Sequence, residues 1–486
     1  MRIIYIDIDS LRPDHLGCYG YPRNTSPSID RIAEQGVRFT NCYVSDAPCL
    51  PSRTALWSGR FGIQTGVVSH GGTTSQPSIE GPQRGHRDSF GTDGWMNALR
   101  QAGLTTTTIS SFGERHSAWH WYAGFSEIIN PGHGGMEQAH TVTALALDWL
   151  ERHAQRDQWF LHINYWDPHT PYRVPEAFGT PLTHDPLPAW ITEEVCQQQW
   201  NSSGPHSAQE PHGFGQEEDA QRYPRVPAQI NSLSAVRKWI DGYDVGISYA
   251  DEYIGRIIEA LTDANIFDET VIIIGADHGE NLGELNVWGD HQTADSITCR
   301  VPLIVRWPGA TNTPRVDDAL HYQFDWAATM LELMGQPVSE TWDGQSFAEA
   351  FRNGTTQGRP HLILSQGAWT CQRGVRVGDH LYLRTYDPCF KELPPELLFD
   401  LAHDPHEQHD LMTEQLDVAQ QARRILDSWE LTMLRTNPTG TDPLITTIRE
   451  GGSIYARGRL TSYVERLRAT DRTARAEQLL AEYSNR

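Results

Sequence analysis

The feature that most constrains this chain is a short apolar run near its start that ends in acidic residues. Residues 3–8 are almost all β-branched or aromatic, and Asp7 and Asp9 stand at the end of the run. Such runs are typical of strands buried on both faces of a parallel sheet, and α/β sheets bind ligands beyond the carboxyl ends of these strands. Because side chains alternate along a strand, Asp7 and Asp9 lie on one face. Carboxylates this close favour a shared Ca²⁺ or Mg²⁺, although one of them could instead cap the following turn.

Predicted helices and strands alternate through the first three quarters of the chain. A helix that ends near Gly103 precedes a strand over 105–109, and further strands are expected over 159–166 and 271–274, with an amphipathic helix over 239–261 between them. This alternation predicts an α/β fold, in which a large, mostly parallel mixed sheet is flanked by helices.

The sequence pattern changes near residue 360. Four short runs, separated by Gly, Asp and Pro, predict a small antiparallel sheet, and two helical patterns follow them. We therefore expect a larger α/β domain over 1–360 and a C-terminal subdomain over 361–486, built on a short antiparallel sheet plus helices. The expected strands are 361–366, 374–377, 380–386 and 397–401, and the expected helices span about 407–435 and 458–483.

Charge and cysteine content exclude several classes of protein. The 486-residue chain carries a net charge of −23, which argues against a nucleic-acid partner and leaves no basic patch for a membrane surface. Its seven cysteines form no CxxC pair, so neither a zinc site nor a disulfide framework is expected. The first residues enter a strand without a signal-peptide pattern, and no apolar segment is long enough to span a membrane. As given, the sequence predicts a cytoplasmic protein, or a periplasmic or secreted one if a leader has been trimmed.

A second constraining segment surrounds Cys49. Pro48 and Pro51 bracket this cysteine and stiffen the backbone, and a helix-compatible run begins after them. Cys49 is therefore expected at a junction between loop and helix, where backbone N–H groups and the positive end of the helix dipole favour an anion. Arg53 adds a guanidinium suited to oxyanions. The alternative is a buried structural cysteine beside an arginine held in an ion pair.

Residues 49–60 read Cys-Leu-Pro-Ser-Arg, followed by a small-residue run that ends in Gly-Arg, and they resemble the signature of the sulfatase family. The resemblance is to the formylglycine-dependent type I sulfatases of the alkaline phosphatase superfamily. It implies that Cys49 is oxidised to formylglycine, whose hydrated aldehyde, a gem-diol, is the nucleophile, and that Arg53 positions this diol. It also implies a maturation partner, either a formylglycine-generating enzyme or an anaerobic sulfatase-maturing enzyme.

The resemblance also implies a metal site. Asp9 matches the first residue of the aspartate pair that binds the metal in sulfatases, but Ser10 stands at the second position. Either Asp7 supplies the missing oxygen, or Ser10 or water does. Asp277 and His278 match a second metal-binding pair of the family. The implied cation is Ca²⁺, with Mg²⁺ or Mn²⁺ as alternatives, held by Asp7, Asp9, Asp277, His278 and the modified Cys49.

Residues 113–116 follow a predicted strand and correspond to a sulfatase segment with a Lys-x-His pair. His116 matches the histidine that assists the nucleophile. Glu114 stands in the place of the lysine that touches the sulfate, so Arg115 is expected to supply the positive charge. His70, in a glycine-rich loop, is a second candidate for the substrate pocket.

His169 and His291 are two candidates for protonating the leaving oxygen. His169 lies in a segment similar to the Pro-His-x-Pro-Tyr sequence of sulfatases, whose histidine faces the sulfate. His291 stands close to the position of a lysine that bridges metal site and sulfate in many sulfatases, and a protonated histidine can donate to the same oxygen. The sequence leaves the choice between them open.

The resemblance implies hydrolysis of a sulfate ester, on a sulfated carbohydrate or another sulfated small molecule. The first alternative is a phosphonate or phosphate monoester or diester hydrolase of the same superfamily, because sulfate and phosphate share tetrahedral geometry. The second is a non-catalytic sulfoglycan-binding relative. Residues 173–235 are rich in Pro, His, Gln, Glu and Gly, and we expect this long irregular segment to form a lid or specificity loop.

Overall fold

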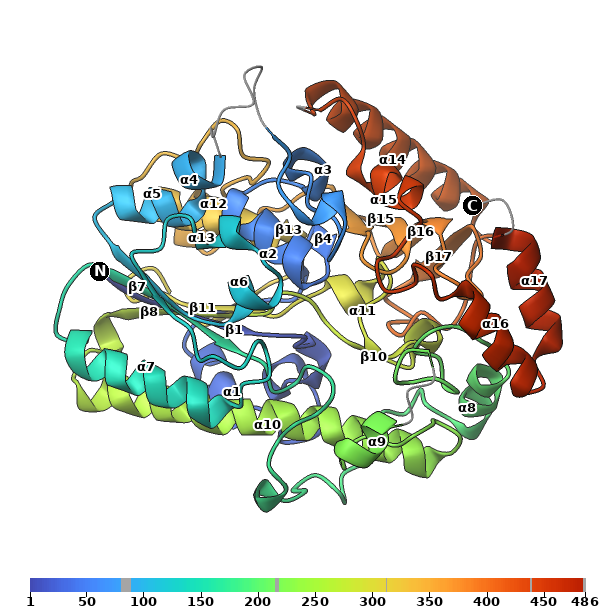
Figure 1. Ribbon diagram of the computed structural model, residues 1–486. Coiled ribbons are helices and arrows are strands. Elements are labelled where there is room, and N and C mark those ends of the chain that lie inside the picture. The colour runs from blue at the N-terminus through green and yellow to red at the C-terminus, as the bar shows by residue number, and fades with distance from the viewer. Residues whose placement is uncertain (80–88, 215–217, 312, 438, 484–486) are drawn as a thin grey trace.

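A central sheet of eight strands organises the protein (Figure 1). The computed structural model describes residues 1–79, 89–214, 218–311, 313–437 and 439–483. In the order β12-β2-β11-β8-β1-β7-β5-β6, β11 is antiparallel to both neighbours and the other pairs are parallel, which confirms the predicted mostly parallel mixed sheet. The strands are β1 (Arg2–Ile8), β2 (Val37–Phe39), β5 (Thr105–Ile109), β6 (Glu127–Ile129), β7 (Trp159–Tyr165), β8 (Thr270–Gly275), β11 (Leu303–Arg306) and β12 (Arg315–Asp317).

Strand β1 lies in the middle of this sheet and is buried along its whole length, as its apolar run predicts. Its register pairs Asp7 with Asn164 of β7 and with Gly275 of β8. The three parallel strands therefore reach the same edge of the sheet with their carboxyl ends. The residues that follow them meet at this edge.

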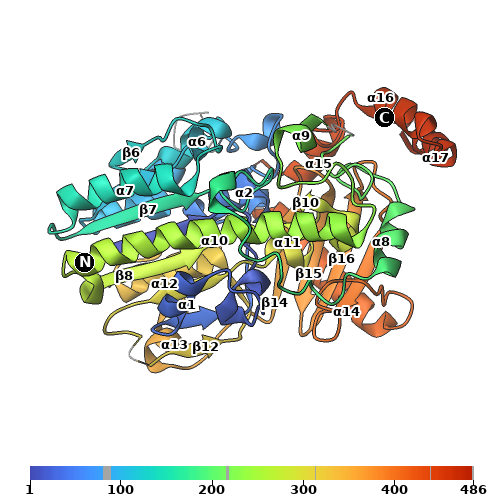
Figure 2. The ribbon, with the colours of Figure 1, turned by 90° about the horizontal axis from the view of Figure 1, so that it is seen from below.

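Two layers of helices cover the sheet. Figure 1 shows α1, α7 and α10 on one face and α2, α5 and α12 on the other, and Figure 2 shows α7, α10 and α1 from the outside. The helix predicted over 239–261 is the middle of α10, which begins earlier because the Ser232 side chain caps its first turn. The helices are α1 (Pro27–Ala33), α2 (Cys49–Ser58), α3 (Gly62–Thr65), α4 (Ser89–Asp93), α5 (Trp95–Gln101), α6 (Phe112–Arg115), α7 (Ala139–His153), α10 (Leu233–Asp263), α11 (Ser296–Cys299), α12 (Gln323–Leu333) and α13 (Ala348–Asn353).

A second sheet has five strands in the order β17-β16-β15-β14-β4. Strands β14 to β17 form the predicted antiparallel sheet, whereas β4 comes from far earlier in the chain and runs parallel to β14. Since β4 ends two residues before Cys49, the start of α2 is attached to the C-terminal sheet. The strands are β4 (Asp46–Ala47), β14 (His361–Gln366), β15 (Cys371–Val377), β16 (His380–Asp387) and β17 (Glu396–Asp400), and the short pairs β3 (Cys42–Tyr43) with β13 (His321–Tyr322) and β9 (Asn281–Leu282) with β10 (Trp288–Asp290) lie apart.

The C-terminal helices differ in extent from the prediction. The first begins later than residue 407, because turns intervene, in one of which the Asp404 carboxylate accepts a hydrogen bond from the His409 N–H. The pattern over 458–483 forms two helices, with Asp471 between them at a φ of +61°. The helices are α14 (Leu416–Thr436), α15 (Pro443–Arg449), α16 (Leu460–Ala469) and α17 (Thr473–Tyr483).

In its described residues, the segment 173–235 is mostly irregular chain that includes the short helices α8 (Glu193–Trp200) and α9 (Glu218–Arg222), and α10 begins near its end. It contacts the C-terminal helices, since the Tyr463 hydroxyl of α16 donates to Glu210 at 3.3 Å. Among the helices described, none combines the length and the apolar character required to cross a bilayer.

Candidate active site

Three carboxylates and one arginine form a buried group at the carboxyl edge of the central sheet. Arg53, on α2, donates from Nε to Asp7 at 2.8 Å. Its Nη1 donates to Asp9 at 3.0 Å and to Asp277 at 2.5 Å. These four side chains are at most 2% exposed. Three carboxylates against one guanidinium leave excess negative charge in a buried place, and such an excess is expected where a cation binds.

The ionisation of these carboxylates is strongly perturbed. Burial opposes ionisation, but the charge of Arg53 lowers the pKa of both Asp7 and Asp9. At Asp277 burial prevails and, helped by the charge of Asp9, raises the pKa. Oδ1 of Asp7 has no hydrogen-bond partner among the residues that the structure describes. An orphaned carboxylate oxygen beside two crowded ones suits a metal ligand.

Ser10 stands where the sulfatase pattern has a second aspartate, and it orients the neighbouring carboxylates. Its backbone φ is +61°, a strained value for a serine. The Ser10 N–H donates to Asp277 Oδ1 at 3.1 Å, and the Ser10 hydroxyl donates to Asp9 Oδ1 at 3.0 Å. The Tyr243 hydroxyl donates to the Ser10 carbonyl at 2.7 Å and holds this conformation.

Cys49 opens α2 and faces the same carboxylates. Its Sγ lies 3.0 Å from Nε2 of His278. Nδ1 of His278 lies 2.8 Å from the Gly279 carbonyl, which can only accept, so the proton is on Nδ1 and Nε2 is free to accept or to ligate. Burial, followed by the charges of Asp9 and Asp277, raises the pKa of the Cys49 thiol. The unmodified side chain is therefore a neutral thiol and a poor nucleophile.

The residues at this edge fit a divalent cation. Ligand atoms of Asp9, Cys49, Asp277 and His278 all lie within 4.8 Å of one another. Two carboxylates and an unprotonated imidazole nitrogen are donors that such cations accept, and the negative charge of the group favours one. Asp7 stands next to them with its free oxygen. The fold thus brings four of the five predicted metal ligands together, Asp9, Cys49, Asp277 and His278, whereas Asp7 is tied to them through Arg53.

Two histidines flank Cys49 on another side. The rings of His70 and His116 are 4.7 Å apart, and a nitrogen of each lies within 4.8 Å of Cys49 Sγ. The Leu50 N–H donates to His70 Nε2 at 3.4 Å, so His70 Nδ1 carries the proton and donates to the Tyr455 hydroxyl at 2.8 Å. Burial, followed by a neighbouring histidine, lowers the pKa of both, to about 3 at His70. Both are neutral bases at pH 7.

Arg115, and not Glu114, lies close enough to the carboxylate group for its charge to help lower the pKa of Asp9. The guanidinium of Arg115 lies 5.2 Å from the ring centroid of Trp166, and that of Arg53 lies 5.5 Å from the same ring. The two positive groups therefore contact the same aromatic ring. Glu114 accepts a hydrogen bond from the Asn130 amide at 2.7 Å on the surface.

His169 and His291 lie together, with ring centroids 5.7 Å apart. Nδ1 of His169 donates to the Thr170 carbonyl, which leaves Nε2 free, and burial lowers the pKa of His169 to about 3. His291 has Asp290 Oδ1 3.4 Å from its Nε2 and Glu280 Oε2 3.6 Å from its Nδ1. Burial opposes protonation of His291, but these two carboxylates outweigh it and raise the pKa.

Sequence reasoning missed two contributors to this site. His162 of β7 lies 3.2 Å from Asp7 through Nε2 and 2.9 Å from the Thr108 hydroxyl through Nδ1. A histidine inside the apolar run 159–166 is the signal that could have identified it. Tyr455 carries no such signal, because it belongs to no recognisable motif and reaches His70 only through the fold.

Comparison with known proteins identifies the family. The family model described as Sulfatase matches residues 2–336, and the model described as N-sulphoglucosamine sulphohydrolase, C-terminal, matches residues 283–437. Iduronate 2-sulfatase of Homo sapiens is 25% identical over 386 residues, which cover 71% of this chain and 66% of that protein. The matched part thus spans just under two thirds of the human protein.

Two solved structures share the fold. One, described as a complex with its substrate D-glucosamine-2-N,6-O-disulfate, has a TM-score of 0.69 at 19% identity over 90% of this chain and 99% of that one. The phosphonate monoester hydrolase of Agrobacterium radiobacter has a TM-score of 0.65 at 20% identity over 89% of this chain and 96% of its own. At these identities the likeness concerns the fold. Because the Sulfatase model matches well over half of the chain and includes both Cys49 and Asp277, the chain belongs to the sulfatase family.

Proposed function

We propose that this protein hydrolyses a sulfate ester on a sulfated carbohydrate, with formylglycine made from Cys49 as its nucleophile. The observation that carries the proposal is the place of Cys49, at the first turn of α2, 3.0 Å from His278 and within 4.8 Å of Asp9 and Asp277. The hydrated aldehyde of formylglycine supplies one hydroxyl for attack on sulfur and a second that lets sulfate leave without attack by water. A thiol has no second hydroxyl and could not replace it.

A divalent cation belongs to this proposal. Ca²⁺ is the family precedent, and Mg²⁺ and Mn²⁺ are the alternatives. When bound, the cation polarises the sulfate and lowers the pKa of the attacking hydroxyl. The residues that would hold it are Asp7, Asp9, Asp277, His278 and the modified Cys49.

The positive groups of the chain would orient and neutralise the sulfate. Nη2 of Arg53 is buried and has no hydrogen-bond partner among the residues that the structure describes, so this donor is available to an oxyanion or to the nucleophilic hydroxyl. Arg115 and His70 would complete the sulfate pocket.

Proton transfer falls to the histidines. His116 has a buried Nε2 without a partner in the described chain and would accept the proton released as sulfate departs. His169 or His291 would protonate the leaving oxygen. The rate against pH of His169→Gln and His291→Gln variants decides between them, because only loss of the true acid removes the alkaline limb of the profile.

The substrate class rests on the relatives. Human iduronate 2-sulfatase is named for a sulfated uronic acid, and the solved neighbour holds a sulfated glucosamine as its substrate. The phosphonate monoester hydrolase neighbour supports the alternative of phosphonate or phosphate ester hydrolysis. Assays with 4-nitrophenyl sulfate, 4-nitrophenyl phosphate and a phenylphosphonate ester separate the two, and a dominant rate on either phosphorus ester would favour the alternative. Binding of sulfated glycans by unmodified protein without turnover would favour a non-catalytic relative.

Mass spectrometry of the tryptic peptide 39–53 tests the nucleophile. This peptide holds both Cys42 and Cys49, so Cys42 is an internal control for thiol alkylation. In active protein we expect iodoacetamide to label Cys42, and Cys49 to be lighter than cysteine and unlabelled. Co-expression with a formylglycine-generating or anaerobic sulfatase-maturing enzyme should raise both the modified fraction and the activity. Full activity from protein whose Cys49 is an alkylatable thiol would refute the mechanism.

A further inference from the structure

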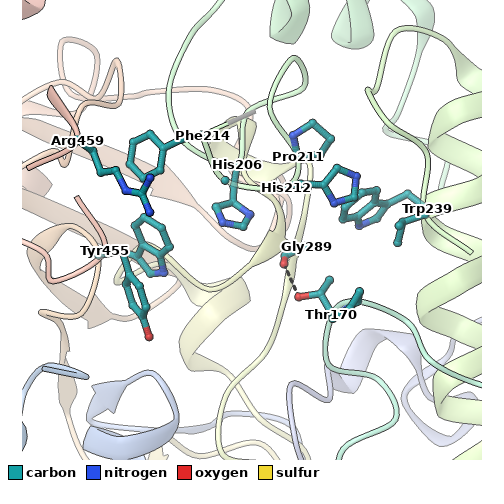
Figure 3. A pocket seen from close by; sticks show the side chains of 13 residues that line it. Thr170, His206, Pro211, His212, Phe214, Trp239, Gly289, Tyr455 and Arg459 are labelled. Carbon is teal, nitrogen blue, oxygen red and sulfur yellow. Dashed lines mark hydrogen bonds between the residues drawn. The ribbon is translucent and has the colours of Figure 1, made fainter. Parts of the chain in front are cut away.

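A pocket of about 300 Å³ opens beside the histidines of the proposed site. Its lining includes Thr170 and Gly289, which are joined by a hydrogen bond from the Thr170 hydroxyl to the Gly289 carbonyl at 2.9 Å (Figure 3). Thr170 follows His169 in the chain, and Gly289 precedes His291 by two residues. The pocket therefore lies on the side of the site where the leaving group is protonated.

Aromatic rings form much of the pocket wall. Trp369 and Tyr455 stack with their centroids 4.7 Å apart and their planes 23° from parallel, and Phe214 lies 6.4 Å from Trp369. Figure 3 shows Phe214, Tyr455 and Arg459 gathered on one side and Trp239 on the other. A stacked aromatic pair that lines a pocket offers an apolar surface on which one face of a sugar ring can pack.

Part of this wall comes from chain that neither family model covers. The models end at residues 336 and 437, and we call residues 439–483 the C-terminal segment. The Ser453 hydroxyl of this segment donates to the Ala368 carbonyl at 2.6 Å, next to Trp369. Arg466 and Arg472 each donate to the buried Glu210 at 3.1 Å. These contacts fix the C-terminal segment against the irregular segment that carries the opposite wall.

Tyr455 connects this segment to the loop of the nucleophile. Its hydroxyl accepts from His70 Nδ1 at 2.8 Å, and His70 Nε2 accepts from the N–H of Leu50, which follows Cys49. Two hydrogen bonds therefore separate the C-terminal segment from the reacting centre. A ring stacked on Tyr455 would lie beside the sulfate pocket.

Arg459 gives the pocket its positive charge. Its exposed guanidinium lies over the Phe214 ring, 5.9 Å from the centroid. Within the described part of the chain, no carboxylate is at ion-pair distance from this guanidinium and none lines the pocket. Asp290 lies nearby, but its Oδ2 is 2.9 Å from Nε2 of the lining residue His206 and pairs with that histidine. In a chain of net charge −23, an arginine without a carboxylate at a pocket indicates an anionic ligand.

We propose that this pocket binds the ring of a sulfated sugar that carries a second anionic group, either a carboxylate or a second sulfate. Tyr455 and Arg459, from the C-terminal segment, are its specificity residues: the ring packs on Tyr455, and the second anion accepts hydrogen bonds from Arg459. This inference rests on the proposed sulfate ester hydrolysis. A quaternary ammonium would also suit the aromatic faces, but the charge of Arg459 opposes it.

Matched pairs of substrates test the proposal in the formylglycine-containing protein. Glucosamine 2-N,6-O-disulfate is compared with glucosamine 6-O-sulfate for the second sulfate, and glucuronic acid 2-O-sulfate with glucose 2-O-sulfate for the carboxylate. Choline sulfate represents a cationic leaving group. We expect a higher kcat/KM for the member with the second anion in at least one pair, and the lowest for choline sulfate. Arg459→Gln should reduce that preference about tenfold, as expected for a charge-assisted hydrogen bond.

Arg449→Gln is the matched control, because Arg449 is an exposed arginine of the same segment that does not line the pocket. Equal kcat/KM within both pairs, a preference for choline sulfate, or equal effects of the two arginine variants would overturn the inference and leave sulfate hydrolysis standing. The proposed function fails separately, if modified protein releases sulfate from no substrate. Calorimetry with the Cys49→Ala protein then still decides: tighter binding of the dianionic member, lost in Arg459→Gln, supports the pocket assignment, and equal binding contradicts it.

Discussion

The carboxylate centre and the pocket wall beside it are built in opposite ways. Asp7, Asp9 and Asp277 follow or end parallel strands, are at most 2% exposed, and meet at one guanidinium. Most residues of the wall lie in loops, with Trp239 on α10 and Gly289 in β10, and its Tyr455 is 40% exposed. Sheet register fixes the first group, whereas packing between distant segments fixes the second. Under the proposed function, the reacting groups would be held by the central sheet and the residues that recognise the substrate by the loops around it.

The largest effect is expected for Cys49→Ala, which should lower kcat strongly and change the unfolding free energy little. Cys49→Ala removes the precursor of the nucleophile, so kcat should fall at least about a thousandfold. Loss of one buried sulfur should cost only about 1 kcal/mol of unfolding free energy. Sulfate release and urea denaturation measure the two effects. Cys42→Ala is the control, since Cys42 is equally buried but lies away from the carboxylates. Activity of Cys49→Ala within tenfold of wild type would contradict this assignment.

The next effect concerns the stability of the carboxylate centre. Arg53→Met leaves three buried carboxylates without their guanidinium, and the unfolding free energy should fall by about 3–5 kcal/mol. Added Ca²⁺ should recover part of this loss, because a cation bound only to the folded state stabilises it. The control is Arg31→Met, at an exposed position of α1, which should change the unfolding free energy by no more than about 0.5 kcal/mol. A loss at Arg53 as small as that at Arg31 would show that the group is not electrostatically coupled.

A smaller effect is expected at the pocket wall. Glu210→Gln weakens the pairs with Arg466 and Arg472, so the unfolding free energy should fall by about 2 kcal/mol. The wall would loosen while the carboxylate centre stays intact, so KM for the preferred saccharide should rise more than kcat falls. Glu477→Gln breaks only an exposed pair with Arg468 and is the control. A fall in kcat at constant KM would mean that the two regions are not separate.

The smallest effect is on pH dependence and involves Asp167, which follows β7. Burial, only partly offset by a hydrogen bond from the Ala139 N–H, raises the pKa of Asp167 to about 7. The unfolded chain has a pKa of about 3.9 there, so the folded state binds this proton more tightly. The resulting stabilisation is complete below about pH 4 and is lost as the pH rises through about 7. Between about pH 6 and about pH 7 the unfolding free energy of Asp167→Asn should therefore fall by about 1 kcal/mol less than that of wild type in urea titrations. Identical pH profiles would exclude a raised pKa at Asp167.

Local sequence patterns were sufficient to predict the central strands and the start of α2. The runs 3–8 and 271–274 predicted β1 and β8, and parallel topology then placed the carboxylates that follow them at one edge. The prolines around Cys49 predicted its position at the start of α2. These features depend on a few neighbouring residues and on a sheet with one regular register.

The rest depends on contacts between segments that no local pattern encodes. Ser10 supports Asp9 and Asp277 only because its φ is positive and Tyr243 holds its carbonyl. The meeting of Tyr455 with His70 requires the C-terminal segment to fold back over nearly the whole chain. Strand β4 is too short to read as a strand without its partner.

The pairing of β4 with β14 bears on how this protein can be divided. The proposed division at residue 360 separates two sheets in sequence, yet Asp46 and Ala47 pair across it with Ser365 and Gln366. Gln366 also donates to the His291 carbonyl at 2.6 Å. A fragment that stopped at residue 360 would release the Cys49 loop and His291 together. The candidate site therefore depends on contact between the two parts of the chain on either side of residue 360. Two co-expressed fragments would restore the site only if β4 and β14 paired again.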